Sequence, residues 1–302
     1  QTLQQDNPAV SADEPIDMTS RVTNAKMDLT YGWYQNPAGG NFGPLNIPAE
    51  AKGEATTTRM WEHWWAGGLP EGQAIYQELS NLPNGKYRLR MAAMITQGGT
   101  NPQAFVYAND AETKVTSASL AYYTVEGEVT DHTLSLGLRI KAGNNGQWSA
   151  VTDISLTYLD GQRGILRDTY NEAQTAYEAS GTTDEELESL LATTETLLAN
   201  ESATTAECMT AGETLEAALH DFRVAHSTAE QPYDMTYLLE NPTFGAAHNQ
   251  GWTEDGYSGE GGYPKYGAGA IEYWHCTFDL HQTLPTCPTD NTASAHRWEL
   301  SR

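Results

Sequence analysis

The sequence predicts a multi-domain β plus α protein that combines an antiparallel β-sandwich, a three-helix bundle and a partial second β-sandwich. Three observations lead to this prediction. Short alternating runs fill residues 16–161, the hydrophobic period rises from two to about 3.6 over residues 162–228, and the opening of the first part is echoed after residue 229. A polar segment, residues 1–15, comes first, and we expect it to be flexible.

The first part carries alternating apolar and polar runs that are bounded by Gly, Pro and Asn. Alternation places successive side chains on opposite faces of a sheet, which is typical of a sandwich. Within Leu82-Pro83-Asn84-Gly85, the Asn-Gly pair tolerates positive φ, so this turn is expected to close a tight hairpin. The clearest strands span residues 75–79, 86–94, 104–108, 132–140 and 150–159.

Three helices are predicted in the second part. The first spans about 165–179 and stops at Gly181, a residue that suits a helix C-terminus. The second begins at a cap formed by Thr183 or Asp184, and the third begins near Thr205. Each helix has one apolar stripe, so the simplest arrangement is an antiparallel bundle.

A sequence echo predicts the second sandwich. Pro15-Ile16-Asp17-Met18-Thr19 recurs as Pro232-Tyr233-Asp234-Met235-Thr236. Three further matches follow in the same order: Gly32-Trp33 with Gly251-Trp252, Glu62-His63-Trp64 with Glu272-Tyr273-Trp274, and Gln77-Glu78-Leu79 with Gln282-Thr283-Leu284. Residues 229–286 are therefore expected to open a second, truncated copy.

The echo stops at Cys287, where the hairpin sequence of the first copy has no counterpart. Back-translation from Cys287, read one nucleotide earlier, permits Leu-Pro-Asn-Gly-Gln-Tyr-Arg-Leu, which is nearly the sequence of residues 82–89. We interpret residues 287–302 as a frameshifted tail. A sandwich that is cut short exposes a strand edge, so self-association through this part is expected.

Charge limits the possible partners. With 40 acidic and 16 basic residues the formal net charge is -24, so the surface repels nucleic acid and anionic membranes. Neutral glycans, cationic groups and calcium are compatible with it. The apolar stretches are far shorter than the roughly 20 residues of a membrane span, which argues against insertion. The polar start at Gln1 is typical of a mature secreted terminus, and we expect a secreted or cell-surface protein.

The cysteines give no support for a metal or thiol centre. Cys208, Cys276 and Cys287 have no zinc-ligand spacing, and three cysteines cannot form a closed disulfide framework. Cys208 lies in the third predicted helix, where it is expected to be a small buried hydrophobe.

Two segments carry a resemblance to known families. The Glu-x-Trp segment at Glu62 and the Leu-Pro-Asn-Gly-x-Tyr-Arg-Leu segment at residues 82–89 resemble galactose-binding-like jelly rolls, the fold of many carbohydrate-binding modules. The helical part resembles FIVAR-type bundles between such modules in secreted proteins of polysaccharide-degrading bacteria. The resemblance implies a jelly-roll sandwich and non-catalytic binding of a plant or host polysaccharide, with no cofactor required.

Sugar recognition uses exposed aromatic faces flanked by groups that bond hydroxyls. Residues 59–65 hold three Trp and precede a loop-like stretch. Trp61 and Trp65 are the predicted platforms, because Trp64 recurs as Trp274 and core packing explains a recurring Trp. The alternative is that all three rings are packed inside. The other candidates are Arg59, Glu62, His63, Tyr34, Tyr123 and Trp148.

Galactose-binding-like modules often carry a structural calcium ion close to their first and last strands. Asp17 and Asp28 lie near the first predicted strand and Asp153 lies in the last, so the resemblance implies a possible calcium site there. The alternative is that all three are solvated acids, as expected in a chain with so many carboxylates.

Two other classes of function remain open. A glycoside hydrolase needs two carboxylates across a sugar site, and Glu62 with Glu78 is one such pair, although no catalytic motif marks it. A structural or adhesive spacer would use the sandwiches as rigid units and the bundle to set their distance. Exposure of the tryptophans would separate a binding module from a spacer, whereas an enzyme requires converging carboxylates.

Overall fold

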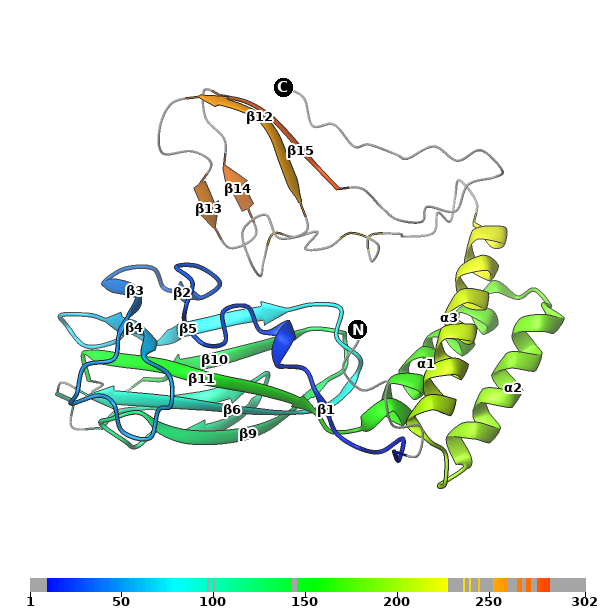
Figure 1. Cartoon of the computed structure of the whole chain (residues 1–302), viewed down its shortest axis with the longest axis horizontal. Coiled ribbons are helices and arrows are strands. Elements are labelled where there is room, and N and C mark those ends of the chain that lie inside the picture. The colour runs from blue at the N-terminus through cyan, green and yellow to red at the C-terminus, as the bar shows by residue number, and fades with distance from the viewer. Residues whose placement is uncertain are drawn as a thin grey trace.

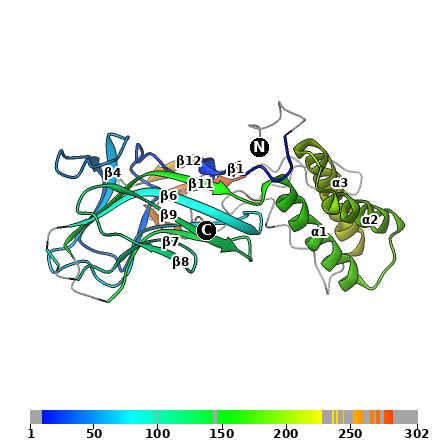
Figure 2. The same ribbon diagram turned by 90° about the horizontal axis from the view of Figure 1, so that it is seen from below.

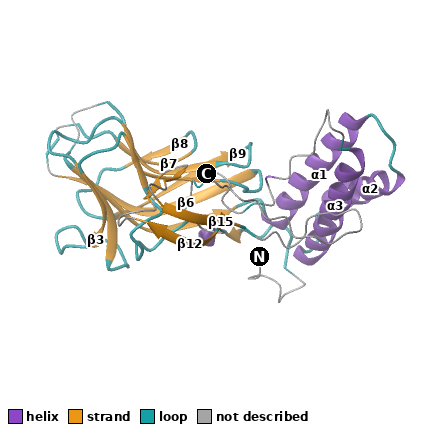
Figure 3. Ribbon diagram, turned by 90° about the horizontal axis from the view of Figure 1, so that it is seen from above, coloured by secondary structure: helices purple, strands orange, loops and turns teal. Residues whose placement is uncertain are grey.

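The computed structural model describes residues 10–96, 98–99, 101–142 and 146–227. In the C-terminal part it describes Thr236, Leu239, Phe244 and the stretches 252–259, 265–267, 270–272 and 276–282. The strands of the first part form one block and the three helices form another beside it (Figure 1, Figure 3). The predicted combination of an antiparallel β-sandwich with a helical part is confirmed.

Two antiparallel sheets form the sandwich. The first sheet has the order β3-β4-β11-β6-β9, with β1 also paired to β11, and the second sheet has the order β2-β5-β10-β7-β8. The strands of the first sheet are β1 (Ile16–Asp17), β3 (Asn41–Asn46), β4 (Arg59–Trp64), β6 (Gly85–Thr96), β9 (Ala121–Val129) and β11 (Trp148–Tyr158). Those of the second are β2 (Tyr34–Asn36), β5 (Gly72–Leu79), β7 (Ala104–Ala108), β8 (Ala111–Lys114) and β10 (Leu134–Ile140).

The main core lies between the two sheets and is filled by alternate side chains of each strand. A smaller apolar cluster lies on the outer face of the first sheet, where Ala51 and Ala55 of the connection between β3 and β4 pack against the strands. Met60, Met94 and Trp148 belong to this cluster. The outer face of the first sheet is therefore partly covered.

The segment Leu82-Pro83-Asn84-Gly85 is a turn but does not close a hairpin. It joins β5 in the second sheet to β6 in the first, so the expectation of a hairpin between them is wrong. The Asn84 backbone N–H and side-chain amide both donate to the Asp168 carboxylate, each at 3.0 Å. The turn thus serves as a contact with the first helix.

The helices are α1 (Gly161–Ser180), α2 (Glu185–Ala199) and α3 (Thr205–His226), and they lie side by side (Figure 2). The Asp184 side chain caps α2, and Thr204 with Glu207 forms a reciprocal cap on α3, as Asp or Thr at these positions favours. Cys208 is fully buried, as predicted. Among the described helices, none has a stretch apolar and long enough to span a bilayer.

The expectation of a flexible N-terminal segment is wrong for Val10 onward. The Ala12 N–H donates to the Ala203 carbonyl at 3.1 Å, and the Thr205 N–H donates to the Val10 carbonyl at 2.9 Å. These bonds tie the chain that enters β1 to the connection between α2 and α3. Residues 1–9 lie outside the described residues.

In the C-terminal part, β12 (Thr253–Gly259) pairs with β15 (Cys276–His281), and β13 (Lys265–Gly267) pairs with β14 (Ala270–Glu272). Thr253 lies opposite His281, and the sequence echo aligns these positions with Tyr34 and Tyr76, which are paired in the sandwich. The register therefore agrees with the echo here. That residues 229–286 are a truncated second copy, and that they self-associate, stay predictions. The proposed tail, residues 287–302, lies outside the described residues.

Candidate functional site

The predicted Trp61 platform is wrong, because Trp61 lies in the core. β4 runs between β3 and β11, so its side chains alternate between the core and the outer face of the first sheet. Trp61 is 3% exposed and His63 is 1% exposed, and the ring of Phe42 packs edge-on against both. A ring this deeply buried offers no face to a sugar. Burial also lowers the pKa of His63, which keeps its imidazole neutral.

Trp65 follows β4 and is partly buried against the main core. Its ring lies on the turn at Gly39 and Gly40, where a Cβ added to Gly39 would come within 2.5 Å of a ring carbon. On the other side, the His63 ring centroid is 5.8 Å away. Trp65 therefore packs the connection from β2 to β3, and contacts of this kind occupy much of its surface.

Trp64, Glu62 and Trp148 meet on the outer face of the first sheet. Trp64 and Trp148 are cross-strand partners, and the Trp148 Nε1–H donates to the Glu62 carboxylate at 2.7 Å. Burial raises the pKa of Glu62, and the bond from Trp148 opposes that rise. Trp148 is only 7% exposed and Trp64 is partly buried in the covered cluster, so these side chains mainly hold this face together.

The remaining sequence candidates of the first sheet hold loops. The Tyr123 hydroxyl accepts N–H bonds from Thr116 and Ser117, at 3.0 and 2.9 Å, while its ring packs against the main core. The Arg59 guanidinium donates to the carbonyl of Asp28 at 3.5 Å. The sequence candidates as a group are not brought together in one site.

A different set of side chains lies together on the outer face of the second sheet. Because the strands are in register, two rows cross all five strands. We call them the tyrosine row and the arginine row, and together the second-sheet face. The tyrosine row is Tyr34, Tyr76, Gly137, Tyr107 and Glu112. The arginine row is Asn36, Gln73, Arg139, Phe105 and Lys114.

The tyrosine row offers two partly exposed rings, those of Tyr34 and Tyr76. The rings of Tyr34 and Tyr76 are 6.1 Å apart and inclined at 54°. Gly137 lies between Tyr76 and Tyr107 and adds no side chain to the face, which leaves room for the Tyr107 side chain to extend across β10 to Gln73 of β5. Burial raises the pKa of Tyr34 and Tyr76, so both keep hydroxyl groups that can donate hydrogen bonds at neutral pH.

A hydrogen-bond network fixes the polar groups around the Tyr107 hydroxyl. The Gln73 amide donates to the Tyr107 hydroxyl at 3.0 Å and to the Ser135 hydroxyl at 3.2 Å. The two hydroxyl groups are themselves 3.2 Å apart. The Arg139 guanidinium lies 3.7 Å from the centroid of the Tyr107 ring, which is 2% exposed. The face therefore has amide, hydroxyl and guanidinium groups held in fixed positions next to aromatic rings.

Of the sequence candidates, only Tyr34 belongs to this face. The others were missed because they come from strands that are far apart in the chain, and the extra residue Ala74 interrupts the alternation of β5 between Gln73 and Ile75. One signal was available: within 104–108, Phe105 and Tyr107 alternate with small or aliphatic residues, which predicts two aromatic side chains on one face.

The three acids predicted as calcium ligands are Asp17, Asp28 and Asp153, and a structural calcium ion stays a prediction. In the part of the chain that the structure describes, no three acids, histidines or cysteines are grouped closely enough to hold a metal ion. The Asp153 carboxylate accepts bonds from the Thr56 N–H at 2.5 Å and from the Tyr122 hydroxyl at 2.9 Å. The Asp153 carboxylate is thus already engaged by donors of the protein itself. Asp17 caps the turn at Thr19, and Asp28 is exposed.

Asp153→Asn should destabilise the sandwich by about 1–3 kcal/mol at neutral pH, because an amide cannot accept all of these bonds. Asn tolerates the positive φ of 51° at this position, so the change tests the carboxylate alone. Burial would raise the pKa of Asp153, but bonds from Thr56, Tyr122 and Thr57 outweigh it and hold the pKa below 3.8.

The stabilisation is therefore present above pH 3.8 and is lost as the pH falls through the folded-state pKa. Urea unfolding of the parent and of Asp153→Asn between pH 3 and 7 measures this, and the two curves should converge at low pH. A calcium-dependent rise in the melting temperature of the parent, absent in Asp153→Asn, would instead make Asp153 a calcium ligand.

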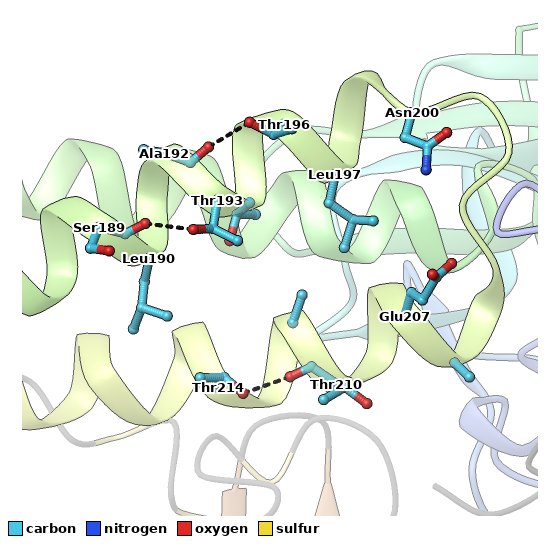
Figure 4. A pocket seen from close by; sticks show the side chains of 13 residues that line it. Ser189, Leu190, Ala192, Thr193, Thr196, Leu197, Asn200, Glu207, Thr210 and Thr214 are labelled. Carbon is cyan, nitrogen blue, oxygen red and sulfur yellow. Dashed lines mark hydrogen bonds between the residues drawn. The ribbon is translucent and has the colours of Figure 1, made fainter.

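A groove of about 1190 Å³ lies between α2 and α3 (Figure 4). Its threonine hydroxyls donate to carbonyls of their own helices, such as Thr193 to Ser189 at 2.9 Å and Thr214 to Thr210 at 2.8 Å. Glu207 at its end is committed to the cap of α3. The groove thus lacks converging polar groups, and we assign it no ligand.

Comparison with known proteins gives structural matches only, since no family model and no curated protein matches the chain. The apo form of a cyclase from Fischerella sp. matches with 16% identity and a TM-score of 0.35, over 49% of this chain and 98% of that chain. Family 16 carbohydrate-binding module 2 matches with 16% identity and a TM-score of 0.33, over 45% and 98%. TmCBM61 in complex with β-1,4-galactotriose matches with 14% identity and a TM-score of 0.31, over 45% and 96%. TM-scores this low carry no argument about function.

Proposed function

We propose that the chain is a non-catalytic module that binds polysaccharide on the second-sheet face. The observation that supports this most directly is the tyrosine row, in which two partly exposed rings lie beside an amide held by hydrogen bonds. A pyranose can place its C–H face on such a ring while its hydroxyls bond the flanking polar groups. Because the rows cross five strands, the face can accommodate several sugars of one chain.

A hydrolase that uses Glu62 and Glu78 has no support in this fold. Glu62 lies on the outer face of the first sheet, while Glu78 is on the outer face of the second, beside Ser135. Stacked sheets are about 10 Å apart, and both carboxylates point away from the space between them. Two carboxylates on opposite sides of a sandwich cannot flank one glycosidic bond.

Tyr76→Ala should weaken retention on a polysaccharide affinity gel about tenfold, because it removes a stacking ring from the middle of the face. The melting temperature should change little, since the ring is partly exposed. Arg88→Ala is the matched control: Arg88 forms an exposed ion pair with Glu126 on the first sheet, and its loss should not affect retention.

The panel for this measurement contains galactan, mannan, xylan and polygalacturonate, each tested with the full chain. Equal retention of Tyr76→Ala and the parent on every glycan that the parent binds would remove the second-sheet face as the site. Failure of the parent to bind any of them would favour the structural spacer over the binding module.

We also propose that the protein acts outside the cell or at its surface, where a polysaccharide ligand would be met. In this proposal the helical bundle, which resembles FIVAR-type spacers, sets the distance between binding modules. The backbone hydrogen bonds of Ala12 and Thr205 support the spacer role, because they join the bundle to the segment that enters β1.

A further inference from the structure

The negative charge of the chain is unevenly distributed. Residues 16–161 contain ten Lys and Arg against fourteen Asp and Glu, whereas the whole chain has 16 against 40. The sandwich is therefore close to neutral compared with the helical and C-terminal parts. At physiological salt, charges separated by more than about 8 Å are largely screened, so the local groups of a face decide which ligand charge it attracts.

Three cations gather at one end of the second-sheet face. Arg139 and Lys114 are both cross-strand neighbours of Phe105 in the arginine row. Lys141, directly after β10, lies with its ammonium 4.9 Å from the centroid of the same ring. Cross-strand neighbours are about 5 Å apart, so these cations surround one phenyl ring.

The nearby carboxylate balances only one of these cations. Glu112 forms an ion pair with Lys141 at 2.6 Å. Lys114 is exposed and bonds the neutral amide of Gln103 at 3.4 Å, and no ion pair of Lys114 or Arg139 is found in the described part of the sandwich. The arginine row thus has an excess of positive charge.

Arg139 is held in place from two sides. Its guanidinium stacks on the Tyr107 ring and donates to the carbonyl of Asn109, which is a neutral acceptor. Its Nε is buried and has no hydrogen-bond partner in the structure. Arg139 as a whole is only partly buried, so a ligand carboxylate can accept charge-assisted N–H bonds from the accessible part of its guanidinium. A planar guanidinium fixed on an aromatic ring is well suited to this contact.

We propose that the arginine row binds carboxylate groups, so that the ligand of the second-sheet face is a polysaccharide containing uronic acids. This inference rests on the proposed glycan-binding function and names its ligand class. The sugar rings stack on the Tyr34 and Tyr76 side of the face, and a carboxylate of the same chain meets Arg139 and Lys114. A neutral glycan would leave this charge unmatched.

Polygalacturonate and its fully methyl-esterified form test the proposal, because they share one backbone and differ in charge. The full chain should retain polygalacturonate at least tenfold more strongly than the ester, and a rise from 0.05 to 0.5 M NaCl should reduce retention of polygalacturonate alone. Arg139→Gln should remove most of the preference, and Lys114→Gln, an exposed change that does not affect folding, should reduce it several-fold.

Arg90→Gln is the matched control, since Arg90 stacks on Tyr122 at 3.4 Å on the opposite sheet and should leave both affinities unchanged. If the parent binds polygalacturonate and its ester equally and Tyr76→Ala binds neither, the uronic-acid assignment is wrong, but the second-sheet face remains the glycan site. Stronger binding of a sulfated galactan than of polygalacturonate would also overturn it. Loss of preference in Arg90→Gln would show that the charge effect is general and not a property of this row.

Discussion

Trp61→Ala is expected to destabilise the sandwich by about 3–5 kcal/mol, the range for removing a large aromatic side chain from a packed core. Trp61 is 3% exposed and contacts Phe42 edge-on, with ring centroids 5.4 Å apart. Its removal leaves a cavity between β4 and the facing sheet that the neighbours cannot fill. Chemical unfolding followed by circular dichroism measures the loss.

Trp61→Phe is the control that separates the ring from the indole N–H. The Trp61 Nε1 is buried and has no hydrogen-bond partner in the structure, so phenylalanine loses volume but removes an unsatisfied donor. We expect Trp61→Phe to cost much less than Trp61→Ala. A Trp61→Ala variant of unchanged stability that fails to bind polysaccharide would restore Trp61 as a ligand platform.

Arg163→Met is expected to reduce the free energy of unfolding by about 2–4 kcal/mol. The change removes the charged donor on α1 that joins the N-terminal segment to the connection between α2 and α3. Arg163 is 7% exposed, and its guanidinium bonds the Asp13 carboxylate at 2.7 Å. It also donates to the carbonyls of Leu198 and Asn200, at 3.1 and 2.9 Å. Methionine keeps the apolar stem but leaves these carbonyls without their donor.

The loss of stability in Arg163→Met should be concentrated at the junction between the sandwich and the bundle. Hydrogen exchange should speed up at Ala12 and Thr205, whose N–H groups bond across it, and less at the centre of β11. Arg167→Met is the matched control, since Arg167 lies on the same helix and is exposed. Equal effects of the two variants would show that the contacts of Arg163 add nothing to the junction.

Several strands and the three helices were predicted from local patterns in the sequence, and β4 shows the limit of such patterns. The predicted strand 104–108 coincides with β7, and the caps at Asp184 and near Thr205 place α2 and α3. β4 was missed as a strand because three Trp beside a glycine-rich stretch are typical of a binding loop as well as of a buried strand. Only its place between β3 and β11 makes Trp61 a core residue.

The candidate site could not be predicted from the sequence, because it is formed by the pairing of strands that are far apart in the chain. Gln73, Arg139 and Lys114 come from three strands separated by many residues, and no spacing in the sequence links them. Register brings them into one row, since a side chain meets its cross-strand partner and not its neighbour in the chain. The bulge at Ala74 of β5 adds a local shift that alternation alone does not predict, and it places Gln73 opposite Arg139.

The sequence by itself determined the class of fold, the change from strands to helices near Gly161, the approximate starts of α2 and α3, and the echo that links Tyr34 with Thr253. Each of these depends on residues close together in the chain or on direct repetition. The tertiary structure alone decided which face of each strand is buried and which side chains share a surface. It showed that Trp61 lies in the core and that the residues around Asn84 contact α1. It also showed that the side chains of the second-sheet face lie together. The physical reason is that burial and cross-strand contact are set by sheet order and register, which are properties of the whole sandwich.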